Sequence, residues 1–149
     1  MNSDLMDYVL DLIWKNHLGV ELCHIPDDHF RSRYLPQQKL IIINTNWWDK
    51  SEIPFMAAHE LGHYVNGDLG VMYYEHTSIW DQHAAFNRND DAYKEHQADL
   101  YALQVIWDFA NFQGYTCEDP GEFMQQFKIP ARMATSILKK FKNSNDLLF

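Results

Sequence analysis

The chain has little of what marks a secreted, membrane-spanning or nucleic-acid-binding protein. Only two of its 149 residues are cysteines, Cys23 and Cys117, and they form no C-x-x-C pair. We expect free thiols in a reducing compartment, with one disulfide as the alternative. No apolar run approaches the roughly 20 residues that span a bilayer, and no basic and apolar leader follows Met1. We therefore expect a cytoplasmic protein with no membrane contact.

Positive charge is also scarce. Lysine and arginine total 12 against 21 acidic residues, which gives a formal charge of −9. Direct binding to nucleic acid or to an anionic membrane depends on clustered basic side chains, so both are unexpected here. A chain of this length with 46% hydrophobic residues predicts one domain spanning residues 1–149 with a core of its own.

Hydrophobic periodicity and turn signals predict an α+β fold with a small antiparallel β-sheet packed against helices. The first helix should be capped by Ser3 or Asp4 and ended by Gly19, and the second should be capped by Ser51. Residues 68–91 read as a long irregular loop, which is usually functional or mobile. Strands are expected over 20–25, 31–34 and 39–44, and later helices over 92–112, 119–127 and 130–141.

The most informative segment is His59-Glu60-Leu61-Gly62-His63, a complete H-E-x-x-H motif. On a helix, His59 and His63 lie on one face and can bind a single zinc ion. Glu60 points about 100° away and can reach a water at the metal rather than the metal itself. The alternative is an accidental His/Glu cluster on an exposed helix.

A catalytic zinc site usually has three protein ligands, so a third must come from elsewhere in the chain. Glu95 and Asp99 are four residues apart on the predicted 92–112 helix and share a face. We expect Glu95 to ligate zinc and Asp99 to accept a hydrogen bond from a ligand histidine. His96 competes with Glu95 for this role, and a solvated helix face is the structural alternative for both carboxylates.

This arrangement predicts one zinc ion per chain and a hydrolytic reaction. Zinc would activate water and polarise a scissile carbonyl, and Glu60 would act as general base. A hydrogen-bond donor is also needed to stabilise the oxyanion. The candidates all lie in the long loop: Tyr73, Tyr74, His76 and His83.

Two segments resemble the ImmA/IrrE family of zinc metallopeptidases. One runs from Ala57 to Asp68 and includes the histidine motif, and the other runs from Glu95 to Ala102, where Tyr101 replaces the usual Phe. The strand that ends at Asn44 also fits. The resemblance implies a zincin-like (gluzincin) core with His59, His63 and Glu95 as ligands and Glu60 as the catalytic glutamate.

The resemblance further implies a bacterial or phage protease that relieves repression by cleaving a helix-turn-helix repressor. No amino-terminal helix-turn-helix segment is expected here, so the repressor would supply any contact with DNA. One competing hypothesis is a non-catalytic binding module, an antirepressor that sequesters a repressor or toxin. Another is a structural zinc site, although such sites normally use four protein ligands, often cysteines.

Overall fold

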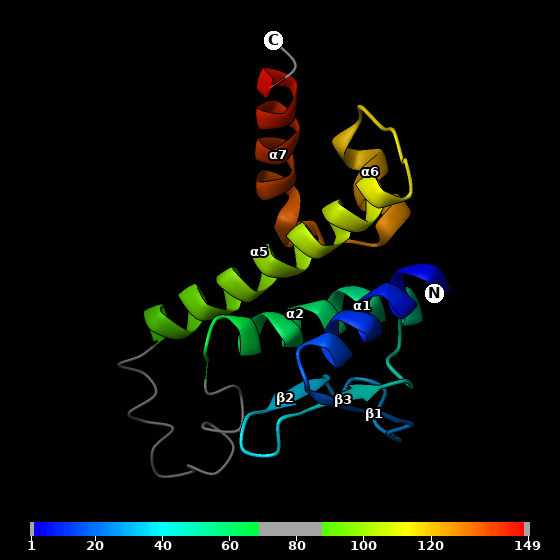
Figure 1. Ribbon diagram of the computed structural model, residues 1–149, viewed down its shortest axis with the longest axis vertical. Coiled ribbons are helices and arrows are strands. Elements are labelled where there is room, and N and C mark those ends of the chain that lie inside the picture. The colour runs from blue at the N-terminus through cyan, green and yellow to red at the C-terminus, as the bar shows by residue number, and fades with distance from the viewer. Residues whose placement is uncertain (1, 69–87, 148–149) are drawn as a thin grey trace.

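The computed structural model describes residues 2–68 and 88–147, and over these ranges it confirms the predicted α+β class (Figure 1). Cys23 and Cys117 are both unpaired. Within the described ranges no helix has the length and apolarity needed to cross a bilayer. The elements are α1 (Ser3–Lys15), β1 (Gly19–Cys23), β2 (Arg33–Leu35), β3 (Leu40–Asn44), the 3₁₀ turn η1 (Lys50–Glu52), α2 (Ile53–Val65), α5 (Arg88–Phe112), α6 (Pro120–Phe127), the 3₁₀ turn η3 (Ala131–Met133) and α7 (Ala134–Leu147).

The sheet has three strands in the order β1-β3-β2, and it is mixed rather than purely antiparallel. β2 pairs antiparallel with β3 as predicted, but β1 pairs parallel with β3, with Gly19 opposite Leu40. The most apolar strand takes the central position, where Ile41 and Ile43 are fully buried. The 16 residues from 24 to 39 are long enough for the crossover that a parallel pair requires.

Several helix boundaries differ from the prediction, and α7 runs over Ala134–Leu147 rather than 130–141. Asn2, not Ser3 or Asp4, caps α1 by accepting a hydrogen bond from the Leu5 amide at 3.0 Å. His17 has a φ of 61° and reverses the chain after α1, so that Gly19 is free to begin β1. Asp49 caps the turn before α2, and α5 begins at Arg88, four residues before the predicted start.

α2 is the central element of the molecule. It lies between the sheet on one side and α5 on the other, with α1 beside it, while α6 and α7 stand beyond α5 (Figure 1). Ten of its thirteen residues, all those from Ile53 to His63 except Met56, are buried. A helix buried on most sides is held rigidly, and it can therefore position polar side chains with precision.

Asn44 ties the crossover connection to the end of β3. Its side chain is fully buried, and its amide nitrogen donates to the carbonyl oxygens of Asp27 and Phe30 at 3.0 and 2.8 Å. Its side-chain oxygen accepts from the amides of Ile25 and Asn46 at 3.2 and 3.0 Å. Both N–H groups and the carbonyl oxygen of the Asn44 side chain are therefore used to hold the turn that leads into β2.

Asn44→Ala should lower the free energy of unfolding by about 2–4 kcal/mol, because it leaves several buried backbone groups without partners. Chemical denaturation measures the change. Asn16→Ala is the control, since the Asn16 side-chain amide donates a single bond to the Leu12 carbonyl. A loss for Asn44→Ala no larger than for Asn16→Ala would contradict this account of the turn.

Candidate metal centre

A glycine on α2 allows the two helices of the site to cross at close range. A Cβ atom at Gly62 would lie 3.0 Å from the carbonyl oxygen and 3.1 Å from the Cα of Ala98, which is on α5. These contacts are shorter than normal packing allows, and backbone atoms cannot swing aside as a side chain can. The close approach brings the histidines of α2 against the carboxylates of α5.

Gly62→Ala should therefore lower the free energy of unfolding by about 1–3 kcal/mol despite the better helix propensity of alanine. It should also weaken any metal binding that needs side chains of both helices, because α5 must move away from α2. Gly121→Ala on α6 is the matched control, since a Cβ there meets only the Asp119 carboxylate at 3.4 Å. Denaturation and zinc titration of both variants test this, and equal behaviour of the two would contradict the packing argument.

His59, His63 and Glu95 converge on one point. The Nε2 atoms of the two histidines are 3.1 Å apart. The Glu95 carboxylate lies 2.8 Å from Nε2 of His59 and 3.1 Å from Nε2 of His63. Both imidazoles are buried, whereas the Glu95 side chain is 47% exposed and forms the open side of the group.

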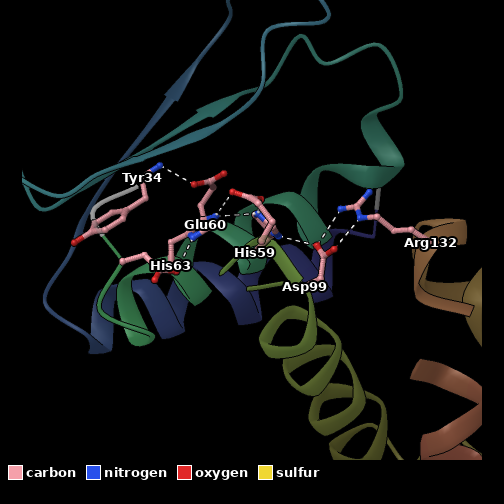
Figure 2. A network of polar contacts seen from close by, with 8 residues as sticks. Tyr34, His59, Glu60, His63, Asp99 and Arg132 are labelled. Atoms are coloured by element: carbon pink, nitrogen blue, oxygen red, sulfur yellow. Dashed lines mark hydrogen bonds and ion pairs between the residues drawn. The ribbon is translucent and has the colours of Figure 1, made fainter. Parts of the chain in front are cut away.

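The other nitrogen of His59 is held by a relay that reaches the carboxyl-terminal part of the chain. Nδ1 of His59 lies 2.7 Å from the buried Asp99 carboxylate. Arg132, from the η3 turn, donates to both oxygens of Asp99 at 2.8 and 3.0 Å (Figure 2). Partial burial alone would raise the pKa of Asp99, but its contacts with His59 and Arg132 lower it to about 2.

His63 has an equivalent partner in Asp68, whose carboxylate lies 3.0 Å from Nδ1. The end of α2 places it there. Gly67 adopts a φ of 74°, and the Asp68 amide then donates to the His63 carbonyl at 2.9 Å. With the bond from the Gly67 amide to the Tyr64 carbonyl, this is a Schellman motif, so the helix cap also delivers the carboxylate.

Glu60 is oriented by the sheet rather than by α5. One of its carboxylate oxygens accepts a hydrogen bond from the Tyr34 amide on β2 at 2.8 Å (Figure 2). Glu60 is 6% exposed, and burial raises the pKa of its carboxyl group. His59, Glu60 and His63 form a buried group whose ligand atoms lie within 4.8 Å of one another. Glu95, however, is the carboxylate in contact with both Nε2 atoms.

The donor set fits a metal cation. Each Nδ1 faces a carboxylate, which can only accept, so Nδ1 carries the hydrogen and Nε2 presents its lone pair. Two lone pairs and a carboxylate then face one point and need a positive charge between them. Two nitrogens bound tetrahedrally to zinc at about 2.0–2.1 Å would be separated by about 3.3 Å, close to the 3.1 Å observed.

The pKa shifts of the same groups also indicate that this point favours a positive charge. Burial alone would lower the pKa of His59, but the carboxylates of Asp99 and Glu95 outweigh it and raise the pKa to about 9. Partial burial would raise the pKa of Glu95, yet its contacts with both imidazoles hold it below its usual range. The cluster therefore stabilises a cation, whether a proton or a metal ion.

The structure brings together the predicted group of His59, Glu60, His63, Glu95 and Asp99. The alternative ligand His96 is exposed on α5, whereas Glu95 contacts both imidazoles. Sequence reasoning missed Asp68, for which the turn after α2 was a usable signal, and Arg132, for which no local signal exists. The proposed oxyanion donors, Tyr73, Tyr74, His76 and His83, lie outside the described residues.

A family model described as the IrrE N-terminal-like domain, a peptidase family, matches residues 15–144. That range contains every residue of the centre and all described elements except most of α1 and the end of α7. Neither a curated protein nor a solved structure shows significant similarity to the chain. Because the family model covers most of its length, the chain belongs to the ImmA/IrrE family of metallopeptidases.

Proposed function

We propose that the protein is a zinc-dependent endopeptidase, with His59, His63 and Glu95 as the ligands of one zinc ion and Glu60 as the general base. The observation that carries this proposal is the convergence of three donor groups within 3.1 Å, with both histidines fixed from behind by carboxylates. Membership of a peptidase family supports the reaction type.

In this proposal water and substrate are activated at the zinc ion, and the side chains of the protein hold the ligands in position. His59, His63 and Glu95 would hold the zinc ion, which would supply a Lewis acid that lowers the pKa of water toward about 7 and polarises a carbonyl. Asp99 and Asp68 keep the proton of each imidazole on Nδ1, which leaves both Nε2 atoms available as ligands. Arg132 in turn holds Asp99 in a fixed orientation.

Glu60 has the position and the environment of a proton carrier. The Tyr34 amide binds one carboxylate oxygen, which leaves the other free to accept a proton from water. Glu60 would then deliver that proton to the leaving amine. Oxyanion stabilisation is assigned to Tyr73, Tyr74, His76 or His83, which lie outside the described residues.

For the substrate we propose a helix-turn-helix repressor of a phage or mobile element, whose cleavage relieves repression. The ImmA/IrrE resemblance of the two motif segments supports this choice. The formal charge of −9 also agrees with a protein that acts on a DNA-bound partner without binding DNA itself.

Cleavage of such a repressor in vitro tests the proposal. The zinc-loaded protein is incubated with the helix-turn-helix protein encoded nearest to its gene, and the products are identified by mass spectrometry. We expect a defined cut that a chelator abolishes and that added zinc restores. An intact repressor together with full derepression in cells would contradict the proposed activity.

A further inference from the structure

A pocket lies about one turn of α2 from the metal centre. Its volume is about 250 Å³. Its apolar walls come from three parts of the chain: the segment after β3, the start of α2 and the segment after α6. The residues are Trp47, Phe55, Met56 and Pro130, with Arg31, Glu52 and Arg132 supplying the polar part. Sites for drug-sized ligands usually measure about 300–1,000 Å³, so this pocket suits a single side chain.

Met56 joins the pocket to the metal centre along α2. It is three residues before His59 and four before Glu60, so it shares their helix face. It is also the one residue between Ile53 and His63 that is not buried. The face of α2 that presents the catalytic groups therefore continues directly into the pocket.

Arg132 provides a second connection, independent of α2. It lines the pocket and also holds the Asp99 carboxylate, which binds Nδ1 of His59. Figure 2 shows Arg132, Asp99 and His59 in contact in that order. The wall of the pocket and the orientation of a metal ligand thus depend on one guanidinium group.

The pocket lies within reach of a residue next to the scissile bond. Three helical residues advance about 4.5 Å along α2, and one residue of an extended chain spans about 3.3–3.6 Å, so the two distances differ by only about 1 Å. A peptide that runs along α2 with its scissile carbonyl at the metal would bring the side chain of an adjacent residue near Met56. We propose that this pocket is a specificity subsite for a large apolar or aromatic side chain next to the scissile bond. This inference rests on the proposed peptidase function.

The lining determines the class of side chain. Phe55 is 1% exposed and forms an apolar floor, and the Arg132 guanidinium lies 5.7 Å from its ring centroid. Arg132 is already paired with Asp99, and the remaining charged residues of the lining, Arg31 and Glu52, carry one charge of each sign. The lining therefore has no excess negative charge that would favour a lysine or arginine side chain. A small side chain would leave the apolar walls without contacts.

A mixed peptide library tests the subsite. The zinc-loaded protein is incubated with the library, and products are sequenced by mass spectrometry. We expect Phe, Leu or Met to be enriched at one position beside the cut. Two synthetic peptides that differ only in Phe or Ala at that position should then differ about 10- to 100-fold in kcat/KM. Absence of any preference for an apolar residue beside the cut overturns the proposal.

Met56→Phe fills the pocket and should reduce the Phe-to-Ala ratio to near one. Met124→Phe is the matched control: it places the same substitution in a neighbouring hollow between η1 and α6. That hollow shares Glu52 and Pro130 with the pocket but not Met56, so the ratio should stay unchanged. Thermal unfolding confirms that both variants fold. A ratio that survives in Met56→Phe, or falls equally in both variants, overturns the proposal.

A binding measurement separates failure of the subsite from failure of the proposed function. If the wild-type protein cuts no library peptide, fluorescence anisotropy is measured on the zinc-loaded Glu60→Gln variant. The two labelled probes are alanine–glycine peptides of identical sequence except for Phe or Ala at the central position. Tighter binding of the Phe peptide by at least about 10-fold, lost when Met56→Phe is added, supports the subsite without peptidase activity. Equal binding of the two peptides overturns the subsite.

Discussion

Glu60→Gln is expected to reduce cleavage by about 10²- to 10⁴-fold while zinc remains bound at one ion per chain. The amide keeps the size of the side chain and can still accept the Tyr34 amide hydrogen bond at one oxygen. It cannot take a proton from water, however, so the step that needs a base fails. Activity assays and metal analysis on the same preparation measure both effects.

Glu21→Gln is the control, because Glu21 is exposed on β1, and it should leave cleavage and zinc content unchanged. The same Glu60→Gln variant also separates a peptidase from an antirepressor. If it relieves repression in cells as well as the wild-type protein does, the binding-module hypothesis is correct and the peptidase hypothesis is wrong.

Glu95→Ala is expected to weaken zinc binding far more than the roughly 10- to 100-fold typical of losing an outer hydrogen-bond partner. Glu95 is the carboxylate in contact with both Nε2 atoms, and its removal leaves two histidines where a catalytic zinc site needs three protein ligands. Zinc titration against a chromogenic chelator measures the loss, and cleavage should fall in parallel at limiting zinc.

His96→Ala is the matched control for this prediction. His96 is next to Glu95 in the sequence but exposed on α5, so its removal should leave the zinc affinity unchanged. If His96→Ala lost zinc and Glu95→Ala retained it, the third ligand would be His96. The account of which face of α5 lies against α2 would then be wrong.

Much of the centre could be predicted because its information is local. The spacing of His59 and His63 defines one helix face, and the spacing of Glu95 and Asp99 defines another. A catalytic zinc site needs a third protein ligand, and this requirement was enough to predict that the two faces lie together. The structure confirms that the four side chains meet.

What could not be predicted depends on contacts between distant segments. Arg132 is 33 residues from Asp99, and no periodicity links the two. The parallel pairing of β1 with β3 follows from the order of strands in space, whereas alternation of apolar residues reports only that a strand exists. The observed caps, Asn2 and Asp49, lie one or two positions before the predicted caps. Several polar residues precede each helix, and the sequence alone does not show which of them caps it.

The central claim is that His59, His63 and Glu95 hold one zinc ion at the crossing of α2 and α5. A crystal structure of the zinc-loaded protein, with anomalous diffraction measured at the zinc edge, tests it most directly. We predict a single strong peak about 2.0–2.2 Å from Nε2 of both histidines and from a Glu95 oxygen. A peak with His96, His76 or His83 in place of Glu95, or no peak between His59 and His63, would contradict the claim.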